Sequence, residues 1–218
     1  MTTLDPPATR AERHAMVSSQ LRTNAVSDTR VVTAMASIPR EDFLPAGAAA
    51  YRDTAIPLGG GRSANPPLAT ARLLTQAELR STDRVLLIGA AGGYAAAVLA
   101  ELVAQVTAVE SEASLLAIAR AALAGMRNVS VVDASLTDGD PAGAPYDVLV
   151  IDGAVEAVPA ALVDQLRAGG RVVSGLVENG VTRLAAGVKT AGGFGLTAFA
   201  DSECVRLPGF ARATGFRF

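Results

Sequence analysis

The sequence predicts a doubly wound α/β fold with a mostly parallel sheet, and three observations lead to this expectation. Apolar runs of strand length alternate with Ala- and Leu-rich runs of helix length from Val85 onwards. The first strand run passes directly into a glycine-rich turn, Gly89 to Gly93. At 218 residues, half of them hydrophobic, the chain is long enough for one domain with a full core. Strands separated by helices pair in parallel, and helices then cover both faces of the sheet.

The first 80 residues are expected to precede the sheet. Residues 8–24 have a helical pattern, and Ser27-Asp28 supplies an N-cap for a helix over 29–38, which Pro39 ends. Three glycines and then prolines interrupt residues 56–67, so we expect a loop without regular structure there, followed by a helix over 68–78. The opening of the chain therefore predicts a helical cap and a shaped loop.

The elements of the sheet follow from the apolar runs and the glycines between them. Strands are expected at 85–88, 105–109, 129–132, 147–151 and 171–174, and helices at 94–103, 112–125 and 158–167. Gly169-Gly170 predicts a helix stop ahead of the last of these strands. Near the C-terminus we expect a helix over 181–189 and late antiparallel strands over 195–200 and 203–207.

Residues 83–112 carry the main functional signal. They form a strand, a glycine turn, a helix and a second strand that ends in Glu110, about 20 residues past the glycines. Small residues in the turn let the backbone approach a nucleotide-like ligand, and the carboxylate can accept hydrogen bonds from two ribose hydroxyls. The turn lacks the G-x-G-x-x-G pattern of phosphate binders. The unit indicates an S-adenosylmethionine site better than a dinucleotide site, although such a turn can also serve packing alone.

The composition excludes several classes of protein. A net charge of −2 and a pI near 5.5 argue against binding to nucleic acid or to an anionic membrane. Cys204 is the only cysteine, so neither an internal disulfide nor a cysteine-based zinc site is expected. The N-terminus lacks a charged-then-apolar signal pattern, and the expected location is the cytoplasm.

A set of motifs along nearly the whole chain resembles protein-L-isoaspartate O-methyltransferases. It consists of the two-helix opening, Ile38 to Pro45, Tyr51-Arg52-Asp53, the glycine loop, Val85 to Gly89, Pro145 to Val148, Pro159 to Leu166 and Gly169 to Val173. The loop Pro57 to Arg62, Asp152 to Pro159 and the final Leu207-Pro208-Gly209-Phe210 resemble a bacterial branch of that family.

The resemblance implies a seven-stranded class I methyltransferase fold that binds S-adenosylmethionine and releases S-adenosylhomocysteine. It implies one domain, 1–218, made of an N-terminal helical cap (1–54), a substrate loop and helix (55–80) and a cofactor-binding α/β core (81–218). Its partner would be a protein or peptide with an isoaspartyl or other carboxylate, and the enzyme would be a monomer or a homodimer.

The chain departs from the family's cofactor motif at three places. Leu87 stands where the family usually has an acid, and Ala91 stands at the middle glycine, where a Cβ is unfavourable if φ is positive. Ala134-Ser135-Leu136, preceded by Asp133, replaces the Gly-Asp-Gly that usually contacts adenine. The cofactor residues implied are Gly89, Ala91, Gly93, Tyr94, Glu110, Asp133, Ser135 and Asp152.

The substrate loop departs as well. Ser63-Ala64-Asn65 stands where the family has a Thr-x-Ser that addresses the isoaspartyl carboxylate, so Asn65 and Ser63 are the candidate catalytic residues. Asp152 follows a predicted strand at the edge where ligands bind open α/β sheets, as a site residue or as a helix cap.

Three functions stay open at this point. The first is a methyltransferase of the isoaspartate type, in which an ionised carboxylate acceptor needs no general base and catalysis depends on positioning and on excluding water. The second is an inactive relative that acts as a binding or regulatory protein, which the altered motifs favour. The third is a Rossmann oxidoreductase, which the absence of G-x-G-x-x-G disfavours.

Overall fold

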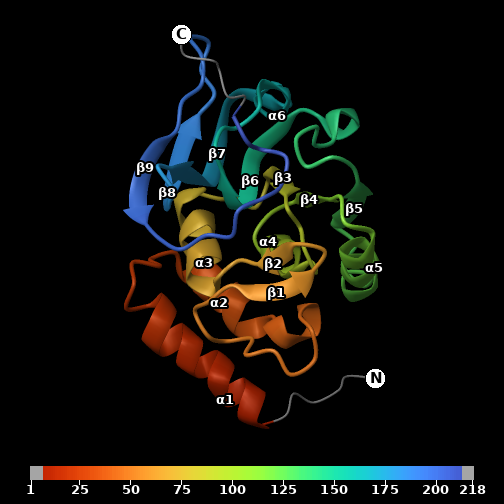
Figure 1. The fold of residues 1–218 in the computed structure, drawn as a ribbon, viewed down its shortest axis with the longest axis vertical. Coiled ribbons are helices and arrows are strands. Elements are labelled where there is room, and N and C mark those ends of the chain that lie inside the picture. The colour runs from red at the N-terminus through yellow and green to blue at the C-terminus, as the bar shows by residue number, and fades with distance from the viewer. Residues whose placement is uncertain (1–6, 213–218) are drawn as a thin grey trace.

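The computed structural model describes residues 7–212 and begins with a helical cap. Helix α1 (Pro7–Ala15) continues into the π-helical η1 (Met16–Leu21), and α2 (Thr29–Ser37) follows, with the short 3-10 helix η2 (Arg40–Phe43) after it. The predicted N-cap is confirmed, because Asp28 Oδ1 accepts a hydrogen bond of 2.9 Å from the backbone N–H of Arg30. The cap lies at one end of the molecule and the sheet at the other (Figure 1).

The segment 56–67 was predicted to lack regular structure, and this prediction is wrong. Strand β1 (Ile56–Gly59) pairs antiparallel with β2 (Arg62–Ala64). Gly60 and Gly61 form the turn with φ of +56° and +72°, so the glycines close a hairpin instead of preventing one. Helix α3 (Pro67–Gln76) then leads to the main sheet.

The main sheet has seven strands in the order β5-β4-β3-β6-β7-β8-β9. The first five in this order pair in parallel, and β8 and β9 add antiparallel to one edge. The predicted mostly parallel seven-stranded sheet is therefore confirmed. The bounds are β3 Arg84–Ile88, β4 Gln105–Glu110, β5 Val129–Asp133, β6 Tyr146–Val155, β7 Leu166–Glu178, β8 Val181–Val188 and β9 Thr197–Asp201.

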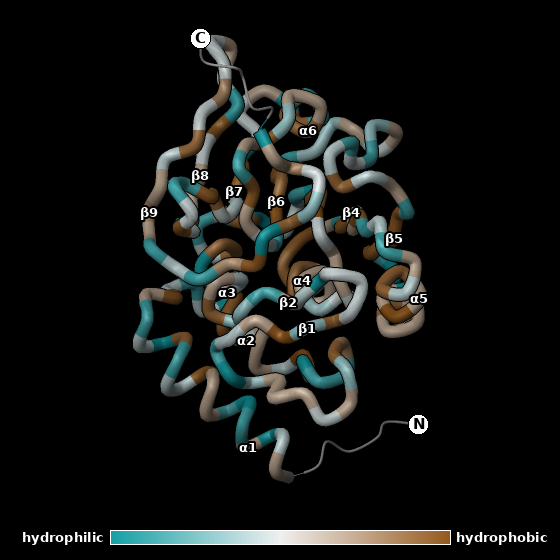
Figure 2. Tube along the Cα trace, viewed as in Figure 1, coloured by the Kyte–Doolittle hydropathy of each residue, from teal (hydrophilic) through white to brown (hydrophobic). Residues whose placement is uncertain are grey.

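Apolar side chains cover both faces of the sheet. Along β3, Val85 and Leu87 belong to a buried cluster shared with the cap and α4 (Tyr94–Ala100), whereas Leu86 and Ile88 belong to a second cluster on the other face. The further helices are α5 (Ala113–Ala122), η3 (Pro141–Gly143) and α6 (Ala160–Asp164). The hydrophobic residues gather along the central strands, and hydrophilic ones recur along α1 (Figure 2). Within residues 7–212, no helix is both long and apolar enough to cross a membrane.

Four expectations in the C-terminal half of the chain are wrong. Residues 181–188 form strand β8 and not a helix, because Asn179 and Gly180 both have positive φ, as in a tight hairpin turn. The helix predicted at 158–167 ends at Asp164, and Gly169-Gly170 lies inside β7 instead of ending a helix. Residues 203–207 form no strand of their own and pair with β6 through a parallel bridge between Ala154 and Arg206.

Candidate functional site

The glycine turn lies at the carboxyl end of β3, where ligands bind open α/β sheets. Gly89 and Gly93 have φ of +81° and +103°, and Ala91 has φ of +51°. The backbone N–H groups of Gly89 and Ala90 both donate to the carbonyl oxygen of Val109, at 3.1 Å each. Ala91 thus adopts the left-handed conformation that glycine adopts freely, at a cost of about 1–2 kcal/mol for a residue with a Cβ.

Gly92 sets the distance between the turn and the cap. A methyl group placed on its Cα would lie 2.2 Å from the carbonyl oxygen of Phe43 in η2. Real Cβ atoms do not come that close to a backbone oxygen, so only glycine lets the cap pack here. The N-terminal cap is therefore part of the wall of the site.

Glu110, at the end of β4, is completely buried. Its Oε1 accepts from the backbone N–H groups of Ser111 (2.9 Å) and Glu112 (3.1 Å), and its Oε2 accepts from that of Ala91 (2.8 Å). Arg62 Nη1, from β2, donates to Oε1 and completes an ion pair whose two side chains are 4% and 0% exposed. The predicted spacing thus brings Glu110 directly beneath the glycine turn.

Tyr94 opens helix α4 and faces the cap. Its ring packs edge-on against Phe43 at 5.9 Å between centroids, and the Arg40 guanidinium lies 5.0 Å from its centroid. Burial raises the pKa of the Tyr94 hydroxyl to about 12. That hydroxyl is buried without a hydrogen-bond partner among the described residues, so one polar atom at the site is open to a ligand.

Asn65 connects the substrate loop to the sheet. Its Nδ2 donates to Asp152 Oδ1 (3.0 Å), and its Oδ1 accepts from the backbone N–H of Val205 (3.0 Å). The hydroxyl of Thr70 donates to the same Asp152 oxygen at 2.8 Å. Burial raises the pKa of Asp152 above its ordinary value and shifts this carboxyl towards the protonated form. Asn65 and Asp152 therefore belong to one buried polar network.

Arg40 and Arg62 line the site but were not predicted as site residues. The Arg40 side chain is almost fully buried, and its Nη2 donates to the carbonyl oxygen of Asn65 at 2.8 Å. Its Nε, like that of Arg62, is buried without a partner among the described residues. Desolvation lowers the pKa of Arg40. Both arginines stand in the motifs identified in the sequence. Their burial marks them as site residues, because arginine is rarely buried unpaired, and the sequence alone does not show burial.

The four parts of the site enclose a small cavity. The cap, the substrate loop, the turn and β6 line it with Arg40, Leu44, Asn65, Ala91, Tyr94 and Asp152. Its volume is about 20 Å³, the space of about one water molecule. Elements far apart in the sequence therefore converge on one point at the carboxyl edge of the sheet.

The structure brings most of the predicted site residues together and leaves three towards the outside. Ser63 lies on β2 opposite Pro57 and is partly exposed. Asp133 is exposed at the end of β5, next to Glu110 in the strand register. Ser135 is exposed, and its hydroxyl is hydrogen-bonded to that of Thr137 at 2.8 Å.

The glycine turn and the Glu110 carboxylate suit the ribose of S-adenosylmethionine in chemical type and spacing. In this conformation that carboxylate is bonded to Arg62 and to three backbone N–H groups. A methyl group on Gly89 would lie 3.0 Å from Leu207 Cδ1, so Leu207 packs closely against the turn. Leu87 is fully buried among apolar side chains and offers no hydrogen-bonding group to a ligand.

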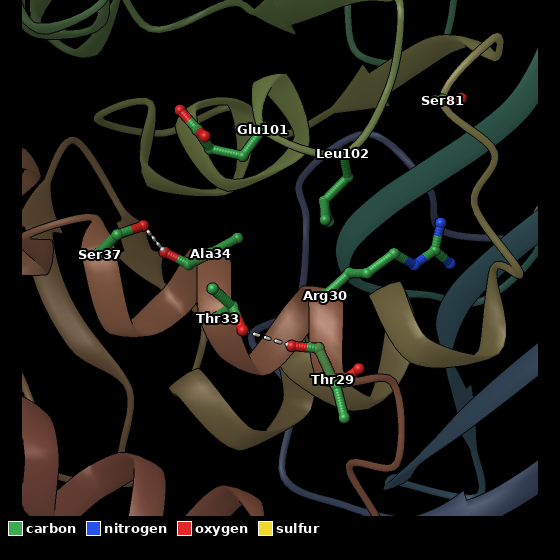
Figure 3. Close-up of a pocket in the computed structure, with 8 residues that line it drawn as sticks. All are labelled: Thr29, Arg30, Thr33, Ala34, Ser37, Ser81, Glu101 and Leu102. Atoms are coloured by element: carbon green, nitrogen blue, oxygen red, sulfur yellow. Dashed lines mark hydrogen bonds between the residues drawn. The ribbon is translucent and has the colours of Figure 1, made fainter.

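A larger hollow lies elsewhere on the molecule. It has a volume of about 360 Å³ and is lined by α2 and by Ser81, Glu101 and Leu102 (Figure 3). These three residues stand at the amino ends of β3 and β4, away from the edge where such sheets bind ligands. The hydroxyls of Thr33 and Ser37 donate to carbonyl oxygens of α2 itself, at 2.8 and 2.9 Å. We therefore place the functional site at the smaller cavity.

The fold and the site define a Rossmann-like methyltransferase. The model of the protein-L-isoaspartate(D-aspartate) O-methyltransferase family matches residues 11–201. The protein-L-isoaspartate O-methyltransferase of Methanoculleus marisnigri is 42% identical over 169 residues, which are 76% of this chain and 77% of that protein. The enzyme of the same name from Roseiflexus castenholzii is 43% identical over 166 residues, 74% of this chain and 76% of that protein.

Solved structures agree with this assignment. A protein-L-isoaspartate O-methyltransferase with 25% identity superposes with a TM-score of 0.79 over 90% of this chain, which spans 66% of that longer chain. A structure from Plasmodium falciparum, described as a β-aspartate methyltransferase in complex with S-adenosyl-L-homocysteine, has the same fold at 16% identity, with a TM-score of 0.77 over 89% of this chain and 97% of that chain. The chain belongs to the protein-L-isoaspartate O-methyltransferase family, whose cofactor is S-adenosylmethionine.

Proposed function

We propose that this chain transfers the methyl group of S-adenosylmethionine to a carboxylate on a protein or peptide, with an isoaspartyl residue as the acceptor. The observation that carries the proposal is the buried Arg40 at the point where the cap, the substrate loop and the glycine turn meet. Family membership supports the reaction class, and the residues around the cavity support the choice of an anionic acceptor.

Arg40 is the residue that favours an anionic acceptor. It is a buried cation at the wall of the cavity, and none of the ion pairs among residues 7–212 includes it. An unpaired buried charge is costly, and a bound carboxylate would compensate it through charge-assisted hydrogen bonds. Asp152 lies nearby, and its raised pKa lessens the repulsion that a second carboxylate would meet.

The residues of the site then act by positioning. Bound S-adenosylmethionine supplies a methyl group on a positively charged sulfur. Arg40 and Asn65 hold the acceptor carboxylate, and Phe43, Leu44 and Tyr94 exclude water from it. An ionised carboxylate is already a nucleophile, so the proposal needs no general base. Asn65 in place of the family's serine and Leu87 in place of its acid are proposed to set a slower rate than in relatives with the full motif.

The cofactor residues are proposed in two groups. Gly89, Ala91, Gly93 and Glu110 form the turn and the ribose acceptor, and Asp133 and Ser135 lie further along the same edge, on the side proposed for adenine. The division into a cap (1–54), a substrate segment (55–80) and a core (81–218) remains part of the proposal. So do a cytoplasmic location and a monomer or homodimer that acts on protein without nucleic acid.

The experiment is transfer of labelled methyl from S-adenosylmethionine to matched peptides. One peptide contains an isoaspartyl residue, the second an aspartyl residue, and the third the isoaspartyl residue with its carboxylate converted to an amide. Base-labile label in the first peptide alone is the expected result. Equal labelling of all three peptides, or none of the first, contradicts the proposal. The variant Arg40→Gln should raise KM for the first peptide more than it lowers kcat, because it removes a binding contact.

A further inference from the structure

The cofactor side of the site contains an arginine whose role the proposed function does not explain. Arg62 is the first residue of β2, and its guanidinium forms the buried ion pair with Glu110. Glu110 is also the residue at the end of β4 that a ribose must reach. Arg62, a side chain of the β1–β2 hairpin, is therefore bonded to the carboxylate that the ribose of the cofactor needs.

The hydrogen bonds of Glu110 leave little room for a ribose. A carboxylate offers about four lone-pair sites, and Glu110 has four donors, namely Arg62 and the N–H groups of Ala91, Ser111 and Glu112. The three backbone donors are fixed by the turn and by the start of α5. Arg62 is the one donor of the four on a side chain, so it is the one that can leave.

Leu207 covers the same place from the other side. Its Cδ1 lies 3.0 Å from a methyl group placed on Gly89, and its Cγ lies 2.7 Å from one placed on Gly153. Its backbone N–H donates to the carbonyl oxygen of Ala154 at 3.0 Å, which fixes this C-terminal segment to β6. Arg62 Nη2 lies 3.6 Å from the same position on Gly89. The two side chains thus meet above the turn.

Resting on the proposed function, we propose that Arg62 competes with the ribose of the cofactor for Glu110, and that its displacement couples cofactor binding to the substrate hairpin. Arg62 directly precedes Ser63 on β2, and Asn65 follows within the same segment. A cofactor that releases Arg62 therefore changes the strand that carries the candidate acceptor contacts. By linkage, a substrate that favours the released hairpin strengthens cofactor binding by the same factor.

A second carboxylate lies where the displaced guanidinium can go. The Glu112 carboxyl group is 3.0 Å from a methyl group placed on Gly60, in the turn between β1 and β2. Glu112 is partly exposed, so the charge of Arg62 can be compensated at the surface after it leaves Glu110. The charge of Arg62 is then not left unpaired in the interior, and the buried Glu110 carboxylate keeps its three backbone donors and gains the ribose hydroxyls in place of Arg62.

The first test is calorimetric titration of S-adenosylhomocysteine into wild type, Arg62→Gln, Leu207→Ala and Arg80→Gln. Arg62→Gln removes the competing charge and should bind at least about fivefold tighter than wild type, within the usual range of a coupling. Leu207→Ala should bind at least as tightly as wild type. Arg80→Gln is the matched control, because Arg80 is exposed ahead of β3, at the opposite end of that strand from the turn, and its affinity should equal that of wild type.

The outcomes separate this inference from the proposed function. The inference is overturned if the wild-type protein binds S-adenosylhomocysteine and Arg62→Gln binds it no more tightly, or if Leu207→Ala binds it more weakly. The proposed function stands in both cases. Absence of binding in all four proteins overturns both.

A second test needs no variant and follows the coupling itself. Hydrogen exchange of residues 56–65 in the wild-type chain should change when S-adenosylhomocysteine is added, whereas β9 at the far edge of the sheet should not respond. An unchanged exchange pattern over 56–65 with ligand bound overturns the coupling.

Discussion

Asn65 donates a 3.0 Å hydrogen bond from its Nδ2 to Oδ1 of Asp152, across 87 residues of sequence. The same amide accepts from Val205 through its Oδ1, so one side chain joins the substrate loop, β6 and the C-terminal segment. A serine hydroxyl is too short to make both contacts at once. Asn65 therefore has a structural role besides its proposed role in acceptor binding.

Asn65→Ala should lower the free energy of unfolding by about 1–3 kcal/mol, because it leaves buried polar groups without partners. Ser63→Ala, on a partly exposed strand position, is the control and should stay within about 0.5 kcal/mol of wild type. Denaturant unfolding measures both variants. An equal loss in the two would show that the Asn65 network contributes nothing of its own.

Glu110→Gln should lower the stability by about 1.5–3 kcal/mol, because it removes the buried charge-assisted hydrogen bond with Arg62. Arg183→Gln provides the comparison, because the ion pairs of Arg183 with Glu178 and Asp201 are exposed and typically contribute about 0–1 kcal/mol. Thermal and denaturant unfolding should rank the two variants in this order. A loss for Glu110→Gln as small as that for Arg183→Gln would contradict a buried pair.

Gly92→Ala should be destabilising by about 1–3 kcal/mol or more, because its methyl group would collide with the carbonyl oxygen of Phe43. Ala91→Gly is the opposite change in the neighbouring residue. It should cost nothing or stabilise by up to about 1 kcal/mol, because it removes the strain of a positive φ. Unfolding midpoints of the two variants should therefore move apart, and a shift in the same direction would refute this geometry of the turn.

The N-cap of α2 should contribute a pH-dependent term to stability. The hydrogen bond from the Arg30 guanidinium holds the pKa of Asp28 below its ordinary value of 3.8. A carboxyl with a lowered folded pKa stabilises above its unfolded value, and this contribution is lost as the pH falls through the folded pKa. Asp28→Asn keeps the cap but not the charge, so wild type should exceed it by about 0.3–1 kcal/mol at pH 7. The difference should vanish in strong acid, and a difference that persists there would argue against the ionised cap.

The sequence was sufficient for the sheet because its strands are apolar runs and its turn is marked by glycines. The pairing of Val85 to Ile88 with both neighbouring strands follows from that pattern. The pattern was insufficient for Val181 to Val188, because a short stretch of this kind is compatible with both a helix and a strand. The tight turn at Asn179-Gly180 makes it a strand that pairs with β7.

The site was predictable only in part. The distance from the glycines to Glu110 follows from the length of one helix and one strand, and so does its position under the turn. The contacts of Arg40, Arg62 and Leu207 depend on tertiary packing between segments far apart in the chain, which no local pattern encodes. Arg62 and Glu110 are 48 residues apart in the sequence, and Leu207 packs near Gly89 from the segment 203–207.

A crystal structure with S-adenosylhomocysteine and an isoaspartyl peptide bound together tests the proposed site most directly. We expect the ribose on Glu110 with Arg62 displaced, and the acceptor carboxylate between Arg40 and Asn65. A ribose bound away from Glu110, or a peptide carboxylate that contacts neither Arg40 nor Asn65, would contradict this expectation.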